Sequence, residues 1–281
     1  MATVTELHIY PIKSCAGIPV PEAQFLVSGL VAQGVHDREW MLVTREGQFL
    51  TQREYPRMAL LTPRIDGDAV EVNAPGMPPL RLPLAHDAAA QSITVQIWDH
   101  SVEAADCGDA VAGWFADAIQ GPCRLVRFRP DVHRPTSTKW TGGVPAETRF
   151  ADGYPILVIG QASLDDLNAR LQAAGRAPLP MNRFRPNLVV DGIEAFEEDY
   201  VESFALEALA IRPVKPCARC PIPAIDQATG IPGLDPLDIL QSYRANARME
   251  GAVCMGMNCI VTGGEGACLR VGQQLDTAIA F

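Results

Sequence analysis

The sequence predicts a mainly β fold with a few helices, of the α+β class, built in two parts and barrel-like in character. Three observations support this prediction. Most apolar runs are short and alternate with polar residues, which is the period of a half-buried strand. Pro, Gly and Asp interrupt these runs at short intervals, and only a few stretches have helical spacing. At 281 residues, the chain is long enough for two domains.

The first half consists of short predicted strands followed by one helix. A helix is predicted over residues 109–119, with Asp106 as its cap, because the apolar residues there share one face. A Gly-Pro pair then breaks the chain, so we divide it into residues 1–121 and residues 122–281. The strands are expected at residues 3–10, 20–27, 40–44, 69–73 and 92–97.

The second half contains further strands, a polar loop and two helices. The loop is predicted over residues 129–149, which are rich in Pro, Thr and Gly. The first helix is expected over residues 163–173, with Gly175 as its stop. The second is expected over residues 236–245, with Asp235 as its cap and proline at its first position. The strands are expected at residues 123–128, 155–159, 187–190, 204–211, 258–261 and 268–271.

The composition restricts the classes of function. The formal net charge is -10, and no run of Lys and Arg offers the basic surface that nucleic-acid binding requires. The N-terminus lacks the pattern of a secretion signal, and no apolar segment is long enough to span a membrane. Eight cysteines without a disulfide-type spacing suit a reducing compartment, so we expect a cytoplasmic protein with no membrane association.

The most informative segment is KPCARCPIPAIDQATG, residues 215–230. Cys217 and Cys220 stand three residues apart beside Lys215 and Arg219, and such cations stabilise a thiolate over a thiol. At least one of the two sulfurs is therefore expected to bind metal readily. The prolines that follow disfavour a helix, so we expect the thiols on a loop or an extended strand.

Several interpretations of this thiol pair remain open. A thioredoxin-type motif is disfavoured because it opens a helix, and a plant-type iron–sulfur cluster needs a cysteine run that the chain lacks. A structural zinc site would recruit Cys254 and Cys259 as its second pair. Two inert, buried cysteines are the remaining alternative. The cationic neighbours argue against that alternative.

Two further segments are candidates for binding an anion. In YPIKSCAG, Lys13 and Ser14 follow a strand and precede a turn, where an ammonium, a hydroxyl and free N–H groups meet. In RFRPN, Arg185 precedes a proline and is expected to be extended and stiffly held, and Asn187 adds a donor and an acceptor. Arg38, in HDREW, is a further cation. Taken singly, Lys13 is better explained as a solvated surface lysine and Arg38 as a salt-bridge partner. For Arg185, an edge-strand arginine paired to a carboxylate is equally compatible. No Walker, G-x-G-x-x-G, G-x-S-x-G or H-E-x-x-H pattern occurs.

Together, these segments resemble the MOSC-domain proteins that carry an N-terminal MOSC β-barrel module, the family of the mitochondrial amidoxime-reducing component and its bacterial relatives. The resemblance extends to the C-terminal domain of molybdenum cofactor sulfurase. LHIYPIKSCAG, DREWMLV and VQIWDHSVEAADCGDAVAGWFADAI resemble the first module. FADGYPILVIGQASLDDLNARL, RFRPNLVV and KPCARCPIPAIDQATG resemble the MOSC domain. The resemblance implies a β-rich N-terminal module followed by a β-barrel-like MOSC domain.

The resemblance also implies roles for individual residues. It implies that Cys220 ligates molybdenum directly, whereas Cys217 matches a position that does not ligate. The phosphate and pterin of the molybdenum cofactor, a molybdopterin complex, would be held by six residues. These are Lys13, Ser14, Arg38, Arg185, Asn187 and Arg219.

The function implied is that of a molybdenum-cofactor oxidoreductase that reduces small N-hydroxylated compounds, such as hydroxylamines, amidoximes and N-hydroxylated bases. A reductase or a ferredoxin would supply the electrons in trans. The alternative is a sulfur carrier or cofactor-binding protein. In that role, Cys220 would hold a persulfide received from a pyridoxal-phosphate cysteine desulfurase. Both functions need a reactive thiolate, so the cysteine segment alone does not separate them.

Overall fold

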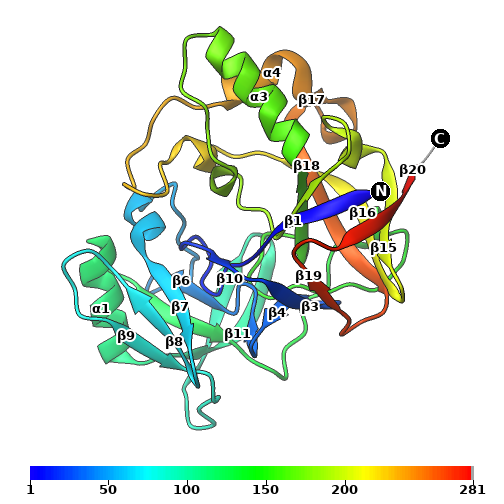
Figure 1. Ribbon diagram of the computed structural model, residues 1–281. Helices are drawn as coiled ribbons and strands as arrows, with labels where there is room; N and C mark the ends of the chain where they lie inside the picture. Colours follow the sequence, from blue (N-terminus) through cyan, green and yellow to red (C-terminus); the bar gives the residue numbers. More distant parts are fainter. Residues whose placement is uncertain (280–281) are drawn as a thin grey trace.

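The computed structural model describes residues 1–279, and its centre is a closed β-barrel (Figure 1). The order of the ring is β13, β14, β1, β20, β15, β16 and β18, and β18 pairs back to β13 to close it. The predicted barrel-like, mainly β architecture is thus confirmed. The strands of the ring are Ala2–Ile9 (β1), Ile156–Gly160 (β13), Leu188–Asp191 (β14), Val201–Leu206 (β15), Leu209–Ala218 (β16), Ala252–Gly263 (β18) and Gln274–Ile279 (β20).

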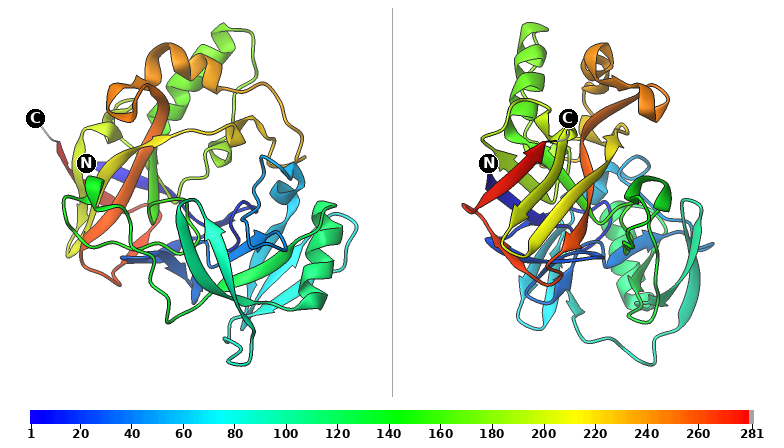
Figure 2. Two further views of the ribbon diagram at one scale, coloured as in Figure 1. Left: turned by 180° about the vertical axis from the view of Figure 1, so that it is seen from behind. Right: turned by 90° about the vertical axis from the view of Figure 1, so that its right-hand side faces the viewer.

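Three smaller sheets lie beside the barrel, and two short strands extend it. The right-hand view of Figure 2 shows β15, β16 and β20 side by side on the barrel wall. Ile18–Pro19 (β2) pairs with β1, and Ala245–Asn246 (β17) pairs with β18. The first small sheet contains Trp40–Val43 (β6), Ser92–Ile97 (β10), His100–Asp106 (β11) and Arg124–Phe128 (β12). The second contains Glu22–Leu26 (β3), Gly29–Ala32 (β4), Val35–His36 (β5) and Cys268–Arg270 (β19). The third contains Thr62–Asp66 (β7), Ala69–Asn73 (β8) and Leu80–Pro83 (β9).

Four α-helices and several 3₁₀ turns complete the described part of the chain. Helix α3 connects β13 to β14, which run parallel, in a β–α–β crossover. The helices are Asp109–Ile119 (α1), Thr138–Thr141 (α2), Gln161–Ala173 (α3) and Leu237–Arg244 (α4). The 3₁₀ turns are Pro56–Leu60 (η1), Met181–Arg183 (η2), Glu197–Asp199 (η3), Ile222–Ala224 (η4) and Ala247–Met249 (η5).

Most predicted elements are present, and the exceptions have local causes. The strand predicted over residues 204–211 is two strands, β15 and β16, joined by a tight turn in which Glu207 has a left-handed φ of 51°. No Gly, Pro, Asn or Asp in this segment marks the reversal. The predicted cap Asp106 does not cap α1. Gly108 occupies that position, and Asp106 pairs with Arg124 instead.

The second predicted cap is displaced by one residue. Pro236, and not Asp235, occupies the N-cap of α4. The carboxylate of Asp235 still accepts a hydrogen bond from the N–H of Leu237 at 3.0 Å. Asp235 therefore stabilises the first turn of the helix from outside it. Gly175 follows α3 with a left-handed φ of 72°, as a stop residue should.

The largest core cluster joins the two halves of the sequence. Leu7 of β1, Trp40 of β6, Phe115 of α1 and Phe204 of β15 all belong to it and are fully buried. Strand β1 belongs to the barrel, and β12, which follows the predicted boundary, pairs with β6 and β11. The division at residue 121 stays a prediction. The segments on either side of it are packed together.

Candidate functional site

Tyr10 lies at the centre of the predicted anion site. It follows β1, and the guanidinium carbons of Arg38 and Arg185 lie 4.2 Å and 4.4 Å from its ring centroid. Its hydroxyl donates to the carbonyl of Pro186 at 3.0 Å. Burial raises the pKa of Tyr10 to about 12, so the phenol is neutral and the ring attracts cations through its π face. One aromatic ring thus joins three segments that are far apart in the sequence.

Gly17 makes the position of this ring possible. A Cβ atom at Gly17 would lie 2.6 Å from Cε1 of Tyr10, which is closer than such contacts allow. The glycine at the end of YPIKSCAG is therefore required because the Tyr10 ring packs against the backbone there.

Apart from the Tyr10 ring, the buried cation of Arg185 has no partner among the described residues. Its side chain makes no hydrogen bond and no ion pair within residues 1–279, and its Nη2 atom is fully buried. Burial lowers the pKa of Arg185, because removing the charge from water is unfavourable. Burying a charge without a counter-ion lowers the stability of the folded protein by roughly several kcal/mol. The site therefore suits an anionic ligand.

Three of the predicted residues have left-handed backbone. The φ angles are 64° for Ser14, 47° for Arg38 and 58° for Arg185. The expectation that Arg185 is extended is therefore wrong. Strained φ values of this kind persist only where surrounding contacts hold them, and they gather at ligand sites.

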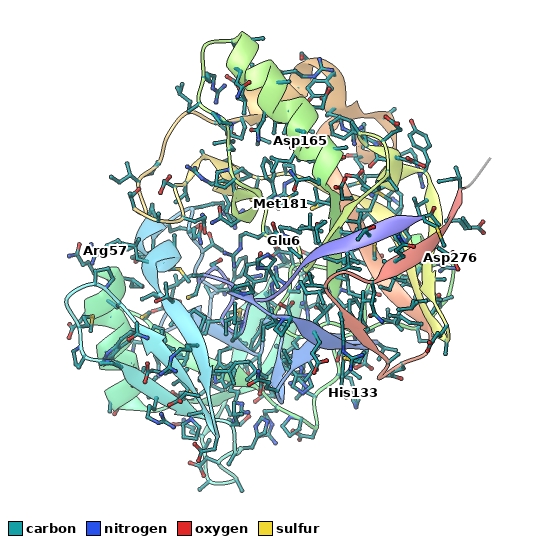
Figure 3. All side chains as sticks on the ribbon, viewed as in Figure 1. Glu6, Arg57, His133, Asp165, Met181 and Asp276 are labelled. Atoms are coloured by element: carbon teal, nitrogen blue, oxygen red, sulfur yellow. The ribbon has the colours of Figure 1, made fainter. Side chains whose placement is uncertain are left out.

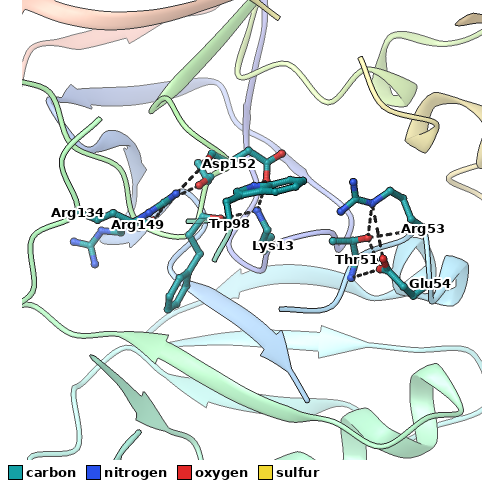
Figure 4. A network of polar contacts seen from close by, with 10 residues as sticks. Lys13, Thr51, Arg53, Glu54, Trp98, Arg134, Arg149 and Asp152 are labelled. Carbon is teal, nitrogen blue, oxygen red and sulfur yellow. Dashed lines mark hydrogen bonds and ion pairs between the residues drawn. The ribbon is translucent and has the colours of Figure 1, made fainter. Parts of the chain in front are cut away.

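Lys13 is largely buried and lies beside Asp152 and Trp98 (Figure 4). Its ammonium donates to the carbonyl of Phe150 at 2.9 Å and to Oδ1 of Asp152 at 2.5 Å. Burial lowers the pKa of Lys13. Because an ammonium has three donors, one remains for a ligand. The same Asp152 oxygen accepts from the indole of Trp98 at 3.1 Å, so that carboxylate fixes the direction of the ammonium.

Arg38 and Asn187 form a hydrogen-bonded unit with Asp37. Nη1 of Arg38 donates to Asp37 at 2.5 Å and to Oδ1 of Asn187 at 3.1 Å. Asn187 is almost fully buried, and its Oδ1 also accepts from the N–H of Leu157 at 3.1 Å, while its Nδ2 donates to the carbonyl of His8 at 3.1 Å. In this arrangement Asn187 orients Arg38. The remaining N–H groups of Arg38 make no hydrogen bond with the described residues.

Ser14 connects to the loop beyond the two thiols. Its carbonyl accepts a hydrogen bond from Nε2 of Gln52 at 2.7 Å. Gln52 and Gln227 exchange amide hydrogen bonds of 3.1 Å and 2.9 Å. The hydroxyl of Ser14 makes no hydrogen bond in the part of the chain that the structure describes. It is therefore available to a ligand.

The thiol pair lies at the end of β16. Cys217 is within the strand and Cys220 follows it, so the predicted extended placement is confirmed. Arg219 contacts Cys217, with Nη1 to Sγ at 3.2 Å, and its Nη2 donates to the carbonyl of Phe184 at 2.9 Å. Lys215 is turned away, and its Nζ lies 5.8 Å from the Trp140 ring centroid. Only one of the two predicted cations therefore contacts a sulfur.

The cysteine loop is joined to the Arg185 segment by a second arginine. Met181, labelled in Figure 3, opens the 3₁₀ turn η2, and Arg183 closes it. Arg183 donates to the carbonyl of Pro223 at 3.2 Å and to Asp226 at 2.7 Å. These bonds place the segment after Cys220 beside the segment that carries Arg185. The Cys220 side chain itself makes no hydrogen bond or ion pair among the described residues.

The zinc interpretation of the thiols is wrong for residues 1–279. No group of three or more His, Cys, Asp or Glu side chains there could hold a metal ion. Cys254 and Cys259 are buried and contact carbonyl oxygens of their own strand, so they supply no second pair. A centre that takes one protein thiolate and brings its other ligands with it stays compatible with the site.

Comparison with known proteins agrees with this arrangement. Residues 1–122 match the MOSC N-terminal beta barrel domain, and residues 145–276 match the MOSC domain. The chain is 36% identical over 253 residues to mitochondrial amidoxime reducing component 2 of Rattus norvegicus, which covers 87% of this chain and 73% of that protein. It is 33% identical over 248 residues to mitochondrial amidoxime-reducing component 1 of Homo sapiens, with 87% and 72% covered.

The fold and the two matched regions define a MOSC-domain protein with an N-terminal MOSC barrel module. More particularly, the chain belongs to the family that contains the mitochondrial amidoxime-reducing components. The resemblance predicted from the sequence is confirmed.

Several residues that organise the site are not evident from the sequence. Tyr10 lies in the segment YPIKSCAG, but its role depends on two arginines from other segments. Asp37 directly precedes Arg38 and could have been proposed as its partner. Gln52 and Asp152 carry no sequence signal, because their contacts are long-range.

Proposed function

We propose that the protein is a molybdenum-cofactor-dependent oxidoreductase that reduces N-hydroxylated compounds with electrons from a partner in trans. One structural observation supports it above the others: Arg185 is buried and charged and has no counter-ion among residues 1–279. The relatives at 36% and 33% identity are named amidoxime-reducing components, which indicates the substrate class.

The residues present fit an anionic cofactor. Arg185 offers all its donors, Lys13 offers one, Arg38 offers the N–H groups not used by Asp37, and Ser14 offers its hydroxyl. Phosphate oxygens accept several charge-assisted hydrogen bonds at once, and guanidinium groups match them in geometry. Asn187 would act by keeping Arg38 in place.

Cys220 would provide the thiolate ligand, and Arg219 would contribute its buried Nε, which has no partner among the described residues. When bound, the cofactor supplies the two-electron chemistry needed to remove the oxygen of an N–O bond. The task of the chain is to orient the cofactor and to hold the loop after β16 rigid. The Arg183 contacts to Pro223 and Asp226 serve that rigidity.

The experiment is an assay of purified protein for molybdenum and pterin, followed by reduction of N-hydroxyadenine with an artificial electron donor. Bound metal with turnover supports the proposal. Bound metal without turnover indicates a storage protein. No metal, but a labile sulfur on Cys220, supports the alternative of a sulfur carrier that receives persulfide from a pyridoxal-phosphate cysteine desulfurase.

The partner and the compartment belong to the same proposal. The electron donor would be a reductase or a ferredoxin, and the substrate a small molecule. The eight cysteines are all free thiols, which suits the cytoplasm. No helix among residues 1–279 has the length and apolar character needed to cross a membrane.

A further inference from the structure

Three cations gather around one tryptophan on the barrel surface, and a fourth lies beside them. The Nζ atoms of Lys139 and Lys215 each lie 5.8 Å from the Trp140 ring centroid, and Cζ of Arg248 lies 5.2 Å from it. Arg212 donates a hydrogen bond to the carbonyl of Thr141, the next residue. We call Lys139, Trp140, Arg212, Lys215 and Arg248 the Trp140 patch.

No cation of the Trp140 patch is neutralised within the described chain. None of the four makes an ion pair with a carboxylate of residues 1–279, although the protein carries 33 acidic residues against 23 basic ones. Glu250, two residues after Arg248, makes no ion pair with it either. Like charges that share one ring repel one another, so an acidic partner would relieve this repulsion.

The patch combines accessible charge with a rigid aromatic anchor. Lys139 and Arg248 are exposed, whereas Trp140 is half-buried. Trp140 packs against the buried cluster that contains Tyr154, Val214 and Ile260. Tryptophan and arginine are enriched among residues that dominate protein–protein binding energy, and a ring held by packing loses little entropy when a partner binds.

The patch and the thiol loop share one strand. Arg212 and Lys215 lie on β16, which ends at Ala218 just before Cys220, and α2, which carries Trp140, packs beside β16 (Figure 2, left view). Cys220 lies five positions after Lys215 along the chain, a distance of at most about 17 Å. A protein interface of about 800 Å² per partner spans roughly 30 Å, so a partner on the patch would also reach the thiol loop.

We propose that the Trp140 patch docks the acidic face of the protein that delivers electrons to this chain. The proposal rests on the proposed function, because it assumes a donor in trans. An acidic donor and a protein of net charge -10 repel each other overall. At the patch, four cations that have no ion pair among the described residues would attract the donor locally.

The test measures binding of an acidic plant-type [2Fe–2S] ferredoxin to the cofactor-loaded protein by calorimetry, at low and at physiological ionic strength. The variant is Lys139→Glu combined with Arg248→Glu, both exposed side chains without hydrogen bonds among the described residues. The control combines Arg45→Glu with Arg270→Glu, an exposed arginine of β19 that pairs with Glu22 at the surface. It gives the same change in net charge.

The expected result is binding that weakens with salt and falls about tenfold or more in the patch variant, with little change in the control. Equal losses in both variants, unchanged affinity in the patch variant, or no binding of ferredoxin by the unmodified protein would overturn the proposal. N-hydroxyadenine reduction driven by dithionite should be equal in all three proteins. If the unmodified protein does not reduce N-hydroxyadenine, the proposed function is contradicted. The binding result would still decide the role of the patch.

Discussion

Arg185 holds its guanidinium 4.4 Å from the centroid of the Tyr10 ring and has no carboxylate partner within residues 1–279. The ring therefore stabilises a buried charge that nothing in the described protein neutralises. Because Arg38 lies over the same ring, both guanidinium groups depend on one side chain. This relationship generates the first two predictions.

Arg185→Ala should lower cofactor occupancy without destabilising the cofactor-free protein. Removing an unpaired buried charge relieves the desolvation cost of folding. The variant also loses charge-assisted hydrogen bonds to the cofactor, each of about 1.5–3 kcal/mol, so cofactor binding should weaken roughly tenfold or more. Molybdenum content and thermal unfolding measure the two effects, with the exposed Arg45→Ala as control. If Arg185→Ala and Lys13→Ala both keep the cofactor content of the unmodified protein, the anion-site assignment is wrong.

Tyr10→Leu and Tyr10→Phe should differ. The phenylalanine retains the ring and loses only the hydroxyl bond to Pro186, at a cost of about 1 kcal/mol in the free energy of unfolding. The leucine also removes the cation–π contacts to Arg38 and Arg185, so cofactor content should fall strongly. If both variants bind the cofactor equally well, the ring does not position these arginines.

Cys220→Ser should abolish bound molybdenum or its activity while the fold stays intact, because a serine hydroxyl is a poor substitute for a thiolate ligand. Cys217→Ser should be mild, since the Cys217 thiol contacts only Arg219 and the carbonyl of Ala218 among the described residues. Metal analysis and circular dichroism of both variants test this. Equal loss in the two variants would indicate a shared redox pair.

Gly17→Ala should displace the Tyr10 ring, because the new Cβ would lie 2.6 Å from Cε1 of Tyr10. We expect destabilisation of about 1–3 kcal/mol, as for other overpacked sites, together with reduced cofactor content. The matched control is Gly113→Ala in α1, where a Cβ meets no atom within 4 Å. A Gly17→Ala protein as stable as the control would show that the ring moves freely.

Glu198→Gln should stabilise the protein at neutral pH. The Glu198 carboxyl is fully buried and accepts from the Ser163 hydroxyl at 2.8 Å, and burial raises its pKa above the ordinary value. The folded state therefore binds the proton of Glu198 more tightly than the unfolded state does. The stability that this proton contributes is lost as the pH rises through the raised pKa.

Unfolding temperatures of Glu198→Gln and the unmodified protein, compared across pH, check this prediction. The difference should vanish below the ordinary pKa of a glutamate and grow as the pH rises. A constant difference across the whole range would show that Glu198 does not titrate between the two states.

Much of the fold could be predicted from local pattern. The period-two strands, α1 and the helix before Gly175 follow from residue spacing, so they appear in the structure where expected. Two predictions were wrong for local reasons. The turn between β15 and β16 lacks the Gly, Pro, Asn or Asp that usually marks a reversal, and Asp106 pairs with Arg124 and so does not cap the helix.

Short stretches of the sequence encode the thiols on an extended segment, the cations of three motifs and the family resemblance, and together they name the residues expected in the candidate site. The pairing of their charges follows from the folded structure. Asp152 pairs with Lys13, 139 residues away, and the adjacent Asp37 pairs with Arg38, whereas Arg185 has no ion-pair partner among the described residues. Burial and long-range charge pairing depend on contacts between segments that are distant in the sequence, and no local pattern specifies them.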